Sequence, residues 1–363
     1  MAIALKEILE QLLERRDLAE EQSRELMLAL TDPETPPAMA GALLAALRSK
    51  GVCAAEVRGF ARGMRSLARR PSIPAGGPIA DVVGTGGDGS HSYNLSTGAA
   101  LLAAACGVRI VKHGNRSVSS RSGSADVLEA LGLKLPLDES EAGRCLDATG
   151  FTFLFAPHYH PAMKAIAPVR AALGIRTVFN LLGPLTNPAE APYAVIGAWN
   201  LPTAALMADT LAGMPIARVF VVHGETGWDE PTPAAPFTLF DVRPGGVTRS
   251  SREPEDFGLA RCRAEDLRGA DAAHNAASLA AVLRGAGRRA HRDAPVMGAR
   301  PLPPGRDVRM HLIGYFEGSS SERGIEWRCA DSLSLRDVLG LELHQRVPDH
   351  SWLSRTRARL PLE

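Results

Sequence analysis

Short apolar segments alternate with helical stretches from residue 79 onward, and this alternation constrains the fold more than any other feature of the chain. The segments are four or five residues long and contain few polar side chains, as expected for strands that are buried on both faces. Strands separated by helices pair in parallel, because each helix carries the chain back across the sheet. We therefore predict an α/β fold with a mainly parallel sheet flanked by helices. Its candidate strands are Ile79–Val83, Val108–Val111, Phe151–Phe155, Tyr193–Gly197 and Val219–Val222.

The N-terminal part of the chain has a different pattern. Apolar side chains recur there every three or four positions up to about Arg70, as in Leu5, Ile8 and Leu12, and this spacing predicts a small all-helical domain. The sequence PSIPAGGP at 71–78 interrupts the helical pattern, so we place a domain boundary near residue 75. With 363 residues and 45% hydrophobic content, the chain can form a core in both domains.

The C-terminal part is unlike the rest, because it is rich in Arg, Pro, Gly and Ser and has weak periodicity. We expect loosely packed structure there. The predicted division is a helical domain at 1–75, an α/β domain at 76–294 and an atypical C-terminal segment at 295–363. A second helical stretch at about 158–190 is predicted to return to the small domain.

Composition narrows the classes of function. The net charge of +1 gives no general attraction to nucleic acid or to an anionic membrane, so we expect neither as a partner. No apolar run reaches the roughly 18 to 20 residues of a membrane-spanning helix, and the N-terminus lacks the pattern of a signal peptide. The five cysteines are too widely spaced to indicate a disulfide framework or a zinc site. We expect a cytoplasmic protein.

The first candidate strand leads into a glycine-rich loop, GTGGDGSHSYNLST, which begins at Gly84. The loop matches the dinucleotide-binding pattern, but the next strand leads into Lys112 and His113 instead of the acidic residue that would bind a ribose. No Gly-Lys-Ser/Thr follows, so it is not a P-loop either. Glycines let backbone N–H groups approach phosphate oxygens, and a helix beginning at Asn94 would attract anions. An ordinary turn with Asn94 or Ser96 as helix cap remains an alternative.

The second candidate strand leads into KHGNRSVSSRSGS, which combines Lys112, Arg116 and Arg121 with several serine hydroxyls. Ligands bind at the carboxyl ends of strands in open α/β sheets, where these side chains would lie. Charged and hydroxyl donors in close succession favour phosphate binding over a solvated serine-rich loop. Two such loops on adjacent strands predict a ligand with several phosphate groups.

The chain resembles the anthranilate phosphoribosyltransferase family. The motifs that carry the resemblance are GTGGDGS at 84–90, NLST at 94–97, KHGNRSVSS at 112–120, SGSADVLEALG at 122–132, the long run HYHPAMKAIAPVRAALGIRTVFNLLGPLTNP at 158–188, and the acidic pair in VVHGETGWDE. The resemblance extends from the N-terminus to about residue 293. It implies a nucleoside phosphorylase/phosphoribosyltransferase-like fold and a homodimer that forms through the helical domain.

The resemblance also implies the reaction and its site. The family joins anthranilate to 5-phosphoribosyl 1-diphosphate (PRPP) and releases pyrophosphate. The residues implied to surround PRPP are Gly84, Gly87, Asp88, Ser92, Asn94, Leu95, Ser96, Thr97, Lys112, His113, Gly114, Asn115, Arg116, Ser117, Val118, Ser119, Ser120 and Ser124. Anthranilate would contact Gly84, Asn115 and Arg170, and Mg²⁺ would be bound by Ser96, Asp229 and Glu230.

The residue types suit this chemistry. Magnesium held by Asp229 and Glu230 would neutralise the leaving pyrophosphate, although an exposed acidic turn before Pro231 is the alternative. The planar fork of Arg170 can bind the anthranilate carboxylate with two hydrogen bonds, and a helix-surface arginine is its alternative. We assign no general base, because a cation-like sugar can be attacked by a neutral aromatic amine. His113 and His158 are candidates for the acceptor pocket or for structural roles.

Two other functions remain open at this point. A pyrimidine-nucleoside phosphorylase would also bind phosphate and ribose, but its loop is not expected to contain the whole KHGNRSVSS run. A catalytically inactive relative that binds nucleic acid is the second alternative, and the unusual C-terminus favours it. The family's expected alanine-rich helices are replaced after Ala294 by a different sequence, which a shifted reading frame or a lineage-specific tail would explain.

Overall fold

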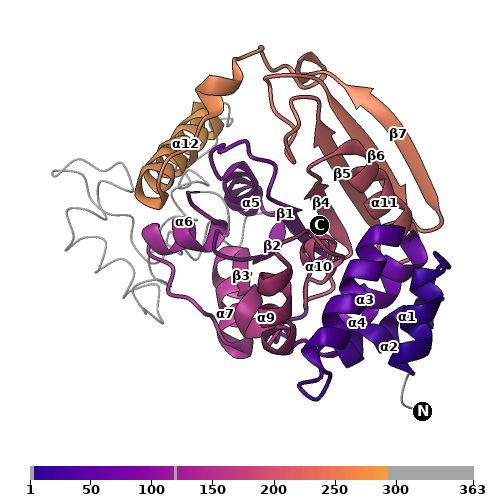
Figure 1. The fold of residues 1–363 in the computed structure, drawn as a ribbon. Coiled ribbons are helices and arrows are strands. Elements are labelled where there is room, and N and C mark those ends of the chain that lie inside the picture. Colours follow the sequence, from indigo (N-terminus) through magenta and orange to yellow (C-terminus); the bar gives the residue numbers. More distant parts are fainter. Residues whose placement is uncertain (1–3, 118–120, 293–363) are drawn as a thin grey trace.

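The computed structural model describes residues 4–117 and 121–292. Its N-terminal part is a bundle of four helices beside a larger sheet domain (Figure 1). The bundle helices are α1 (Leu5–Leu13), α2 (Glu20–Leu30), α3 (Pro37–Lys50) and α4 (Ala54–Ser66). Their apolar positions, including Leu12, Leu26 and Leu43, face inward and are almost fully buried, as the helical spacing predicts.

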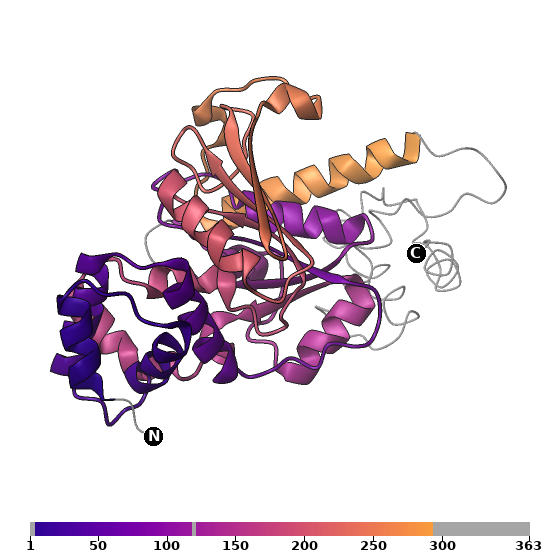
Figure 2. The same cartoon turned by 90° about the vertical axis from the view of Figure 1, so that its right-hand side faces the viewer.

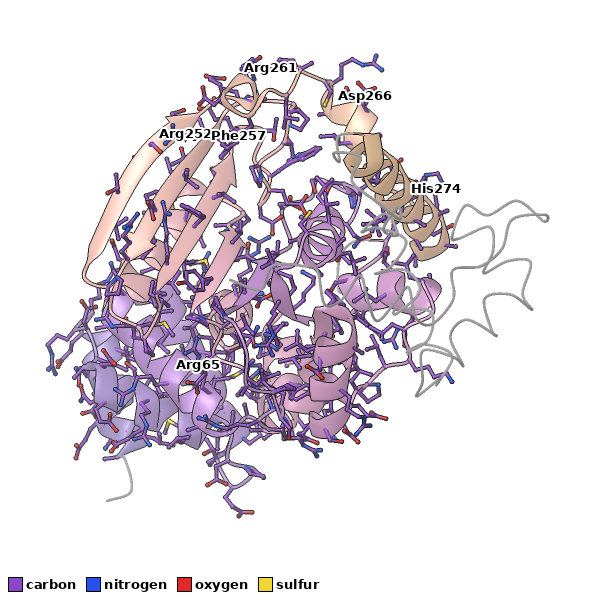
Figure 3. The ribbon with its side chains drawn as sticks, turned by 180° about the vertical axis from the view of Figure 1, so that it is seen from behind. Arg65, Arg252, Phe257, Arg261, Asp266 and His274 are labelled. Carbon is purple, nitrogen blue, oxygen red and sulfur yellow. The ribbon has the colours of Figure 1, made fainter. Side chains whose placement is uncertain are left out.

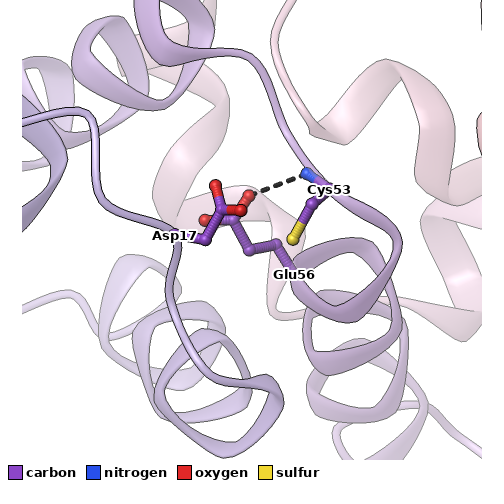
Figure 4. Close-up of side chains that lie close together, drawn as sticks. All are labelled: Asp17, Cys53 and Glu56. Atoms are coloured by element: carbon purple, nitrogen blue, oxygen red, sulfur yellow. Dashed lines mark hydrogen bonds between the residues drawn. The ribbon is translucent and has the colours of Figure 1, made fainter.

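The bundle contains one buried carboxylate, that of Glu56 at the start of α4 (Figure 4). Its oxygens accept hydrogen bonds from the backbone N–H groups of Leu18 and Cys53, each at 2.9 Å. The ammonium of Lys50 lies 2.9 Å from Glu56 and 2.6 Å from Asp17. A charged lysine therefore neutralises the acidic pair, and the cluster has the contacts of a structural ion pair instead of a metal site.

The second helical stretch packs against this bundle. It contains α8 (Ala156–Tyr159), α9 (Met163–Leu173), α10 (Phe179–Leu182) and a 3-10 turn at Gly183–Leu185. Helix α9 lies against α3. Phe179 contacts Phe60 of α4 edge to face, with ring centroids 6.3 Å apart. Residues about 120 positions apart in the chain thus share one core, which also includes Ile166 and Leu182.

The sheet has seven strands in the order β3-β2-β1-β4-β5-β6-β7. The first five are parallel, which confirms the predicted fold class. They are β3 (Phe151–Phe155), β2 (Arg109–Gly114), β1 (Ile79–Gly84), β4 (Tyr193–Gly197) and β5 (Arg218–Gly224). The antiparallel hairpin β6 (Phe237–Arg243) and β7 (Gly246–Arg252) extends one edge and was not predicted. Its signal was the Pro-Gly turn at 244–245 between two segments of strand length.

Helices cover the parallel part of the sheet. They are α5 (Leu95–Ala105), α6 (Ser124–Ala130), α7 (Glu139–Thr149), α11 (Leu201–Ala212) and α12 (Ala272–Arg292), with 3-10 turns at Pro254–Phe257 and Ala264–Leu267. Helix α12 lies alongside α5 (Figure 2). Within the described residues, no helix is long and apolar enough to cross a membrane. The expectation of loose structure at 295–363 falls outside the described residues.

Candidate active site

A cleft of about 790 Å³ lies at the carboxyl ends of the parallel strands. Strand β1 neighbours β2 on one side and β4 on the other, so the strand order reverses direction at β1. Ligands of open α/β sheets bind at such a switch point. Seventeen of the residues predicted from the sequence line this cleft: Gly84, Gly87, Asp88, Ser92, Asn94, Ser96, Thr97, Lys112, His113, Gly114, Asn115, Arg116, Ser117, Ser124, Arg170, Asp229 and Glu230.

The remaining predicted residues are not among those that line the cleft. Leu95 begins α5 but does not line the cleft. Val118, Ser119 and Ser120 fall outside the described residues. His158, a candidate for the acceptor pocket, is also not among the lining residues, because its Nε2 faces Glu139 at 3.5 Å.

The first glycine-rich loop, 84–94, depends on backbone geometry that other residues rarely adopt. Gly86, Gly87 and Gly89 have φ values of 65°, 71° and 74°, in the left-handed region. At Gly84 and Gly197 a side chain would collide with Asp229. The glycines therefore allow the loop to turn sharply and allow the acidic segment from β5 to approach the ends of β1 and β4.

Three carboxylates meet beneath this loop. Asp229 accepts a hydrogen bond from Gly86 N at 2.6 Å and donates its own backbone N–H to Asp88 at 3.2 Å. Glu230 accepts hydrogen bonds from Ser92 Oγ and from Ser96 N, both at 3.1 Å. The loop, the start of α5 and the segment after β5 are thus joined through acidic side chains.

Burial and mutual repulsion change the acidity of this cluster. Burial, followed by the charge of Asp88, raises the pKa of Asp229 to about 6. Burial, followed by the charge of Asp229, raises the pKa of Glu230 to about 8. Carboxylate and hydroxyl oxygens that converge in this way suit a hard divalent cation, which would relieve the repulsion. The residues present therefore fit Mg²⁺.

The sequence predicted that strand β2 ends at Val111 and that the second loop begins at Lys112. In the structure, β2 continues to Gly114, so the first residues of that motif belong to the strand. Lys112 and His113 are strand residues with only 2% and 3% of their surface exposed. The Lys112 ammonium donates a hydrogen bond to the carbonyl of Val82. Burial lowers the pKa of Lys112, whereas the nearby charge of Asp81 opposes that change. The lysine is a buried cation held at the floor of the cleft.

Asp81 of β1 organises this floor. Its carboxylate accepts a hydrogen bond from Asn187 Nδ2 at 2.8 Å and another from His113 N at 3.3 Å. Burial raises the pKa of Asp81 to about 6, and the Lys112 charge opposes the rise. The carboxylate fixes the end of β2 relative to β1. Neither Asp81 nor Asn187 was predicted, because a buried strand position and a loop asparagine carry no signal in the sequence.

The other cation of the second loop faces away from a ligand. The Arg116 guanidinium pairs with Asp126 at 3.0 Å and with Glu129 of α6 at 2.7 Å. Asp126 also accepts hydrogen bonds from the backbone N–H groups of Ser117 and Gly123, at 3.2 and 2.8 Å. Arg116 therefore anchors the loop to α6.

His113, which lines the cleft, lies beside a second buried histidine, His160. Burial lowers the pKa of His113 to about 3 and that of His160 to about 4, and proximity to His160 adds to the effect on His113. Their rings are 5.0 Å apart, and His113 Nδ1 lies 3.0 Å from the carbonyl of Gly183. These two imidazoles are therefore neutral near neutral pH.

Two arginines reach the cleft from the second helical stretch, which contains α8, α9 and α10. Arg170, on α9, has its guanidinium 5.1 Å from the ring of Phe179, and burial lowers its pKa. Arg176 lies over Trp199 at 4.5 Å and donates a hydrogen bond to the carbonyl of Gly87. Among the described residues Arg170 has no acidic partner. Arg176 was not predicted as a site residue. It lies two residues after Gly174, which ends α9 in the left-handed conformation.

The fold and the cleft define a class, the enzymes that transfer a sugar phosphate from a metal-complexed diphosphate donor. The α/β domain profile of a glycosyl transferase family matches residues 76–302, and the helical bundle domain profile of that family matches residues 6–68.

Curated relatives make the family more specific. Anthranilate phosphoribosyltransferase of Chloroflexus aggregans is 44% identical over 309 residues, or 85% of this chain and 90% of the relative. That of Anaeromyxobacter dehalogenans is 47% identical over 274 residues, 76% of this chain and 81% of the relative. The crystal structure of the Thermus thermophilus enzyme is 38% identical, with a TM-score of 0.72 over 97% of this chain and 99% of that one. The chain belongs to the anthranilate phosphoribosyltransferase family. Neither the phosphorylase nor the inactive nucleic-acid-binding alternative is supported.

A third profile matches the end of the chain. Residues 275–359 match a family described as a transposase domain, which overlaps the α/β profile at 275–302. This match covers the segment whose composition departs from the rest of the sequence. The match is consistent with the departure of the sequence from the family pattern after Ala294.

Proposed function

We propose that this protein transfers the phosphoribosyl group of PRPP to the amine of anthranilate, giving N-(5-phosphoribosyl)anthranilate and pyrophosphate in tryptophan biosynthesis. One observation carries the proposal. A single cleft contains the buried Lys112, the buried carboxylate of Asp229 with those of Asp88 and Glu230 close by, and an arginine without an acidic partner among the described residues. A metal-complexed diphosphate fits the first two, and an aromatic carboxylate fits the third.

The donor is proposed to lie between the two loops. Backbone N–H groups of the first loop and the beginning of α5 would hold phosphate oxygens, because a helix N-terminus favours anions. Lys112 would contribute a positive charge from below. Ser96, Asp229 and Glu230 would hold Mg²⁺, with Asp88 close by. Bound there, magnesium would neutralise the charge that develops on the leaving pyrophosphate.

The acceptor is proposed to bind on the side of the second helical stretch. Arg170 would bind the anthranilate carboxylate with two parallel hydrogen bonds, and its stacking on Phe179 fixes the plane of the guanidinium. Asn115 and Gly84 would lie near the amine. The neutral His113 adds no charge to the cleft, and the residues would act by positioning the two substrates and by electrostatic stabilisation.

One assay tests the proposal. Purified protein is mixed with PRPP, MgCl₂ and anthranilate, and the loss of anthranilate fluorescence is followed together with pyrophosphate release. We expect equal amounts of anthranilate consumed and pyrophosphate formed, and no reaction when EDTA is added. Folded protein that binds PRPP and Mg²⁺ without consuming anthranilate would contradict the acceptor assignment.

We also propose that two copies associate through the helical domain. The support is Leu13, at the end of α1, whose surface is 66% exposed although α1 is otherwise amphipathic. Light scattering is expected to give twice the mass of one chain, and Leu13→Glu is expected to shift the protein toward single chains. A monomer at all concentrations for the unsubstituted protein would contradict this proposal.

A further inference from the structure

The segment before α12 is attached to the first loop of the cleft. Tyr93 N donates to the carbonyl of Leu267 at 3.0 Å, and Gly269 N donates to that of His91 at 2.8 Å. The rings of Tyr93 and His274 are stacked with centroids 6.2 Å apart, and Figure 3 shows His274 on α12. Residues near 270 thus run beside residues near 92.

A chain of hydrogen bonds continues from this attachment into the cleft. Ala270 N donates to Asn275 Oδ1 at 2.8 Å, and Asn275 Nδ2 donates to Asn94 Oδ1 at 2.9 Å. Asn94 Nδ2 then donates to the carbonyl of Ser122 at 3.1 Å. Asn275 is 1% exposed. This series of hydrogen bonds begins on the segment before α12, passes through the first loop and ends on the second loop.

The direction of this chain is fixed at both ends by the backbone. An amide N–H can only donate, so it must face Asn275 Oδ1, and a carbonyl can only accept, so it must face Asn94 Nδ2. Reversing either carboxamide would bring two donors or two acceptors together. The Ser122 carbonyl orients the Asn94 carboxamide, and Asn275 holds the opposite side of that carboxamide through the only acceptor it leaves, Asn94 Oδ1.

Packing of α12 reinforces the same arrangement. Ala276 and Leu279 form a small core with Val127 of α6. A Cβ at Gly98 of α5 would lie 2.6 Å from a methyl of Leu279. Helices α5 and α6 begin directly after the first and second loops. Helix α12 thus lies across the two helices whose N-termini form the walls of the cleft.

We propose that Asn275 is a positioning residue for the donor site, which acts through Asn94 to hold the two loops at the spacing that the diphosphate requires. The identity of the ligand as PRPP rests on the proposed function. The series of hydrogen bonds does not, because it depends only on the contacts of Asn275, Asn94 and Ser122. Nothing in the proposal requires Asn275 to touch the ligand.

Asn275→Asp tests the proposal because it keeps the acceptor for Ala270 N and removes the donor to Asn94. Two acceptor oxygens would then face each other, so we expect the Kd for PRPP with Mg²⁺, measured by calorimetry, to rise about tenfold. The KM for anthranilate is expected to stay within about twofold. Asn200→Asp is the matched control, since only its acceptor oxygen is used, to cap α11, and Asp caps equally well.

Two further variants separate positioning from general stability. Asn275→Ala introduces no buried charge and is expected to weaken PRPP binding to a similar degree. Leu279→Ala removes packing of α12 and keeps the series of hydrogen bonds, so it is expected to lower the Tm while raising the Kd for PRPP much less than Asn275→Ala does. Equal effects of Leu279→Ala and Asn275→Ala on that Kd would overturn the proposal.

A double-mutant cycle tests the route of action. If Asn275 acts through Asn94, Asn275→Asp has less than about a twofold effect on PRPP binding once Asn94→Ala is present. Additive effects would show that Asn275 acts by another path and would overturn the proposal. Inorganic pyrophosphate with Mg²⁺ serves as a second probe. The binding measurements do not involve anthranilate, so a protein that fails the turnover assay still gives a decisive result here.

Discussion

The two loops of the cleft differ in how they hold charge. The first loop bends through left-handed glycines over three carboxylates, and the residues between Gly84 and Asn94 contain no lysine or arginine. The second loop rises from β2 with the ammonium of Lys112 buried at its base. One side of the cleft therefore attracts cations and the other attracts anions. A free phosphate would satisfy only the second side, whereas a diphosphate bound to magnesium satisfies both.

The same difference separates charges that serve a ligand from charges that serve the fold. Lys112 and Asp229 are buried at the cleft and Glu230 lies beside them, and among the described residues none of the three has an ion-pair partner within 4 Å. Arg116, in the same loop as Lys112, is paired with Asp126 and Glu129. A charged residue in such a motif is either available to a ligand or paired within the protein. The ion-pair partners in the structure distinguish these two cases.

The largest effect is expected from removing the acidic side of the cleft. Asp229→Asn combined with Glu230→Gln is expected to lower kcat/KM by about a thousandfold, because the charge that develops on pyrophosphate loses its neutralising cation. The rate should also lose its dependence on Mg²⁺ concentration. Glu255→Gln with Asp256→Asn is a matched control, since this adjacent acidic pair is exposed on the 3-10 turn at Pro254–Phe257. A full rate and an unchanged metal response in the first variant would exclude these carboxylates as ligands.

Removing the cationic side is expected to have the next largest effect. Lys112→Met should raise the KM for PRPP by about thirtyfold, as expected for loss of a charge-assisted hydrogen bond to phosphate. The Mg²⁺ concentration at half-maximal rate should change little, because the carboxylates remain. Steady-state kinetics at several metal concentrations checks this. An altered metal requirement with an unchanged KM for PRPP would show that the two sides are not separate.

The acceptor side gives an independent test. Arg170→Ala is expected to raise the KM for anthranilate by about tenfold or more, while the KM for PRPP changes much less. Arg170→Lys keeps the charge and loses the planar fork, so it should recover only part of the loss. Equal increases in both Michaelis constants would contradict the assignment of Arg170 to the carboxylate of anthranilate.

The raised pKa of Glu230 predicts how stability depends on pH. The folded protein holds a proton on Glu230 up to about pH 8, whereas the unfolded chain releases it near its ordinary value of 4.5. The contribution of this group to the free energy of unfolding is therefore full below pH 4.5 and is lost as the pH rises toward 8. We expect the Tm in EDTA to fall by a few degrees over this range, and Mg²⁺ or Glu230→Gln to reduce the fall. A Tm that rises with pH equally in all three samples would contradict this.

The smallest effect is expected at Arg116. Its ion pairs are half-exposed, so Arg116→Ala should cost no more than about 1 kcal/mol in the free energy of unfolding. The KM for PRPP should change by less than about threefold, in contrast to Lys112→Met. Chemical denaturation and steady-state kinetics measure the two quantities. A large rise in the KM would show that the guanidinium leaves Asp126 to bind the donor.

Local pattern was sufficient to predict the parallel sheet. The predicted strands Phe151–Phe155 and Tyr193–Gly197 coincide with β3 and β4, because apolar runs of this length have few alternatives. Strand β2 was predicted to end at Val111, since the polar residues Lys112 and His113 resemble a loop, yet both are buried strand residues. Polar partners from other elements accommodate these side chains, because the Lys112 ammonium donates to the Val82 carbonyl and His113 Nδ1 lies 3.0 Å from the Gly183 carbonyl.

Motifs located most of the cleft, whereas contacts between distant segments could not be predicted. Asn275 lies 181 residues from Asn94 in the chain, and a buried asparagine in a helix has no distinctive spacing. Arg176 was overlooked because its partners, Trp199 and the Gly87 carbonyl, come from other elements. The roles assigned to the individual site residues stay predictions until the variants above are measured.

The origin of Arg170 has a consequence for how enzymes of this architecture can diversify. The donor loops belong to strands β1 and β2, but Arg170 stands on α9, within one continuous segment that is packed on the helical bundle through Phe179 and Phe60. Insertions or substitutions in that segment can reshape the acceptor pocket without disturbing the sheet. A lineage could thereby acquire a new nucleophile while retaining its phosphoribosyl donor.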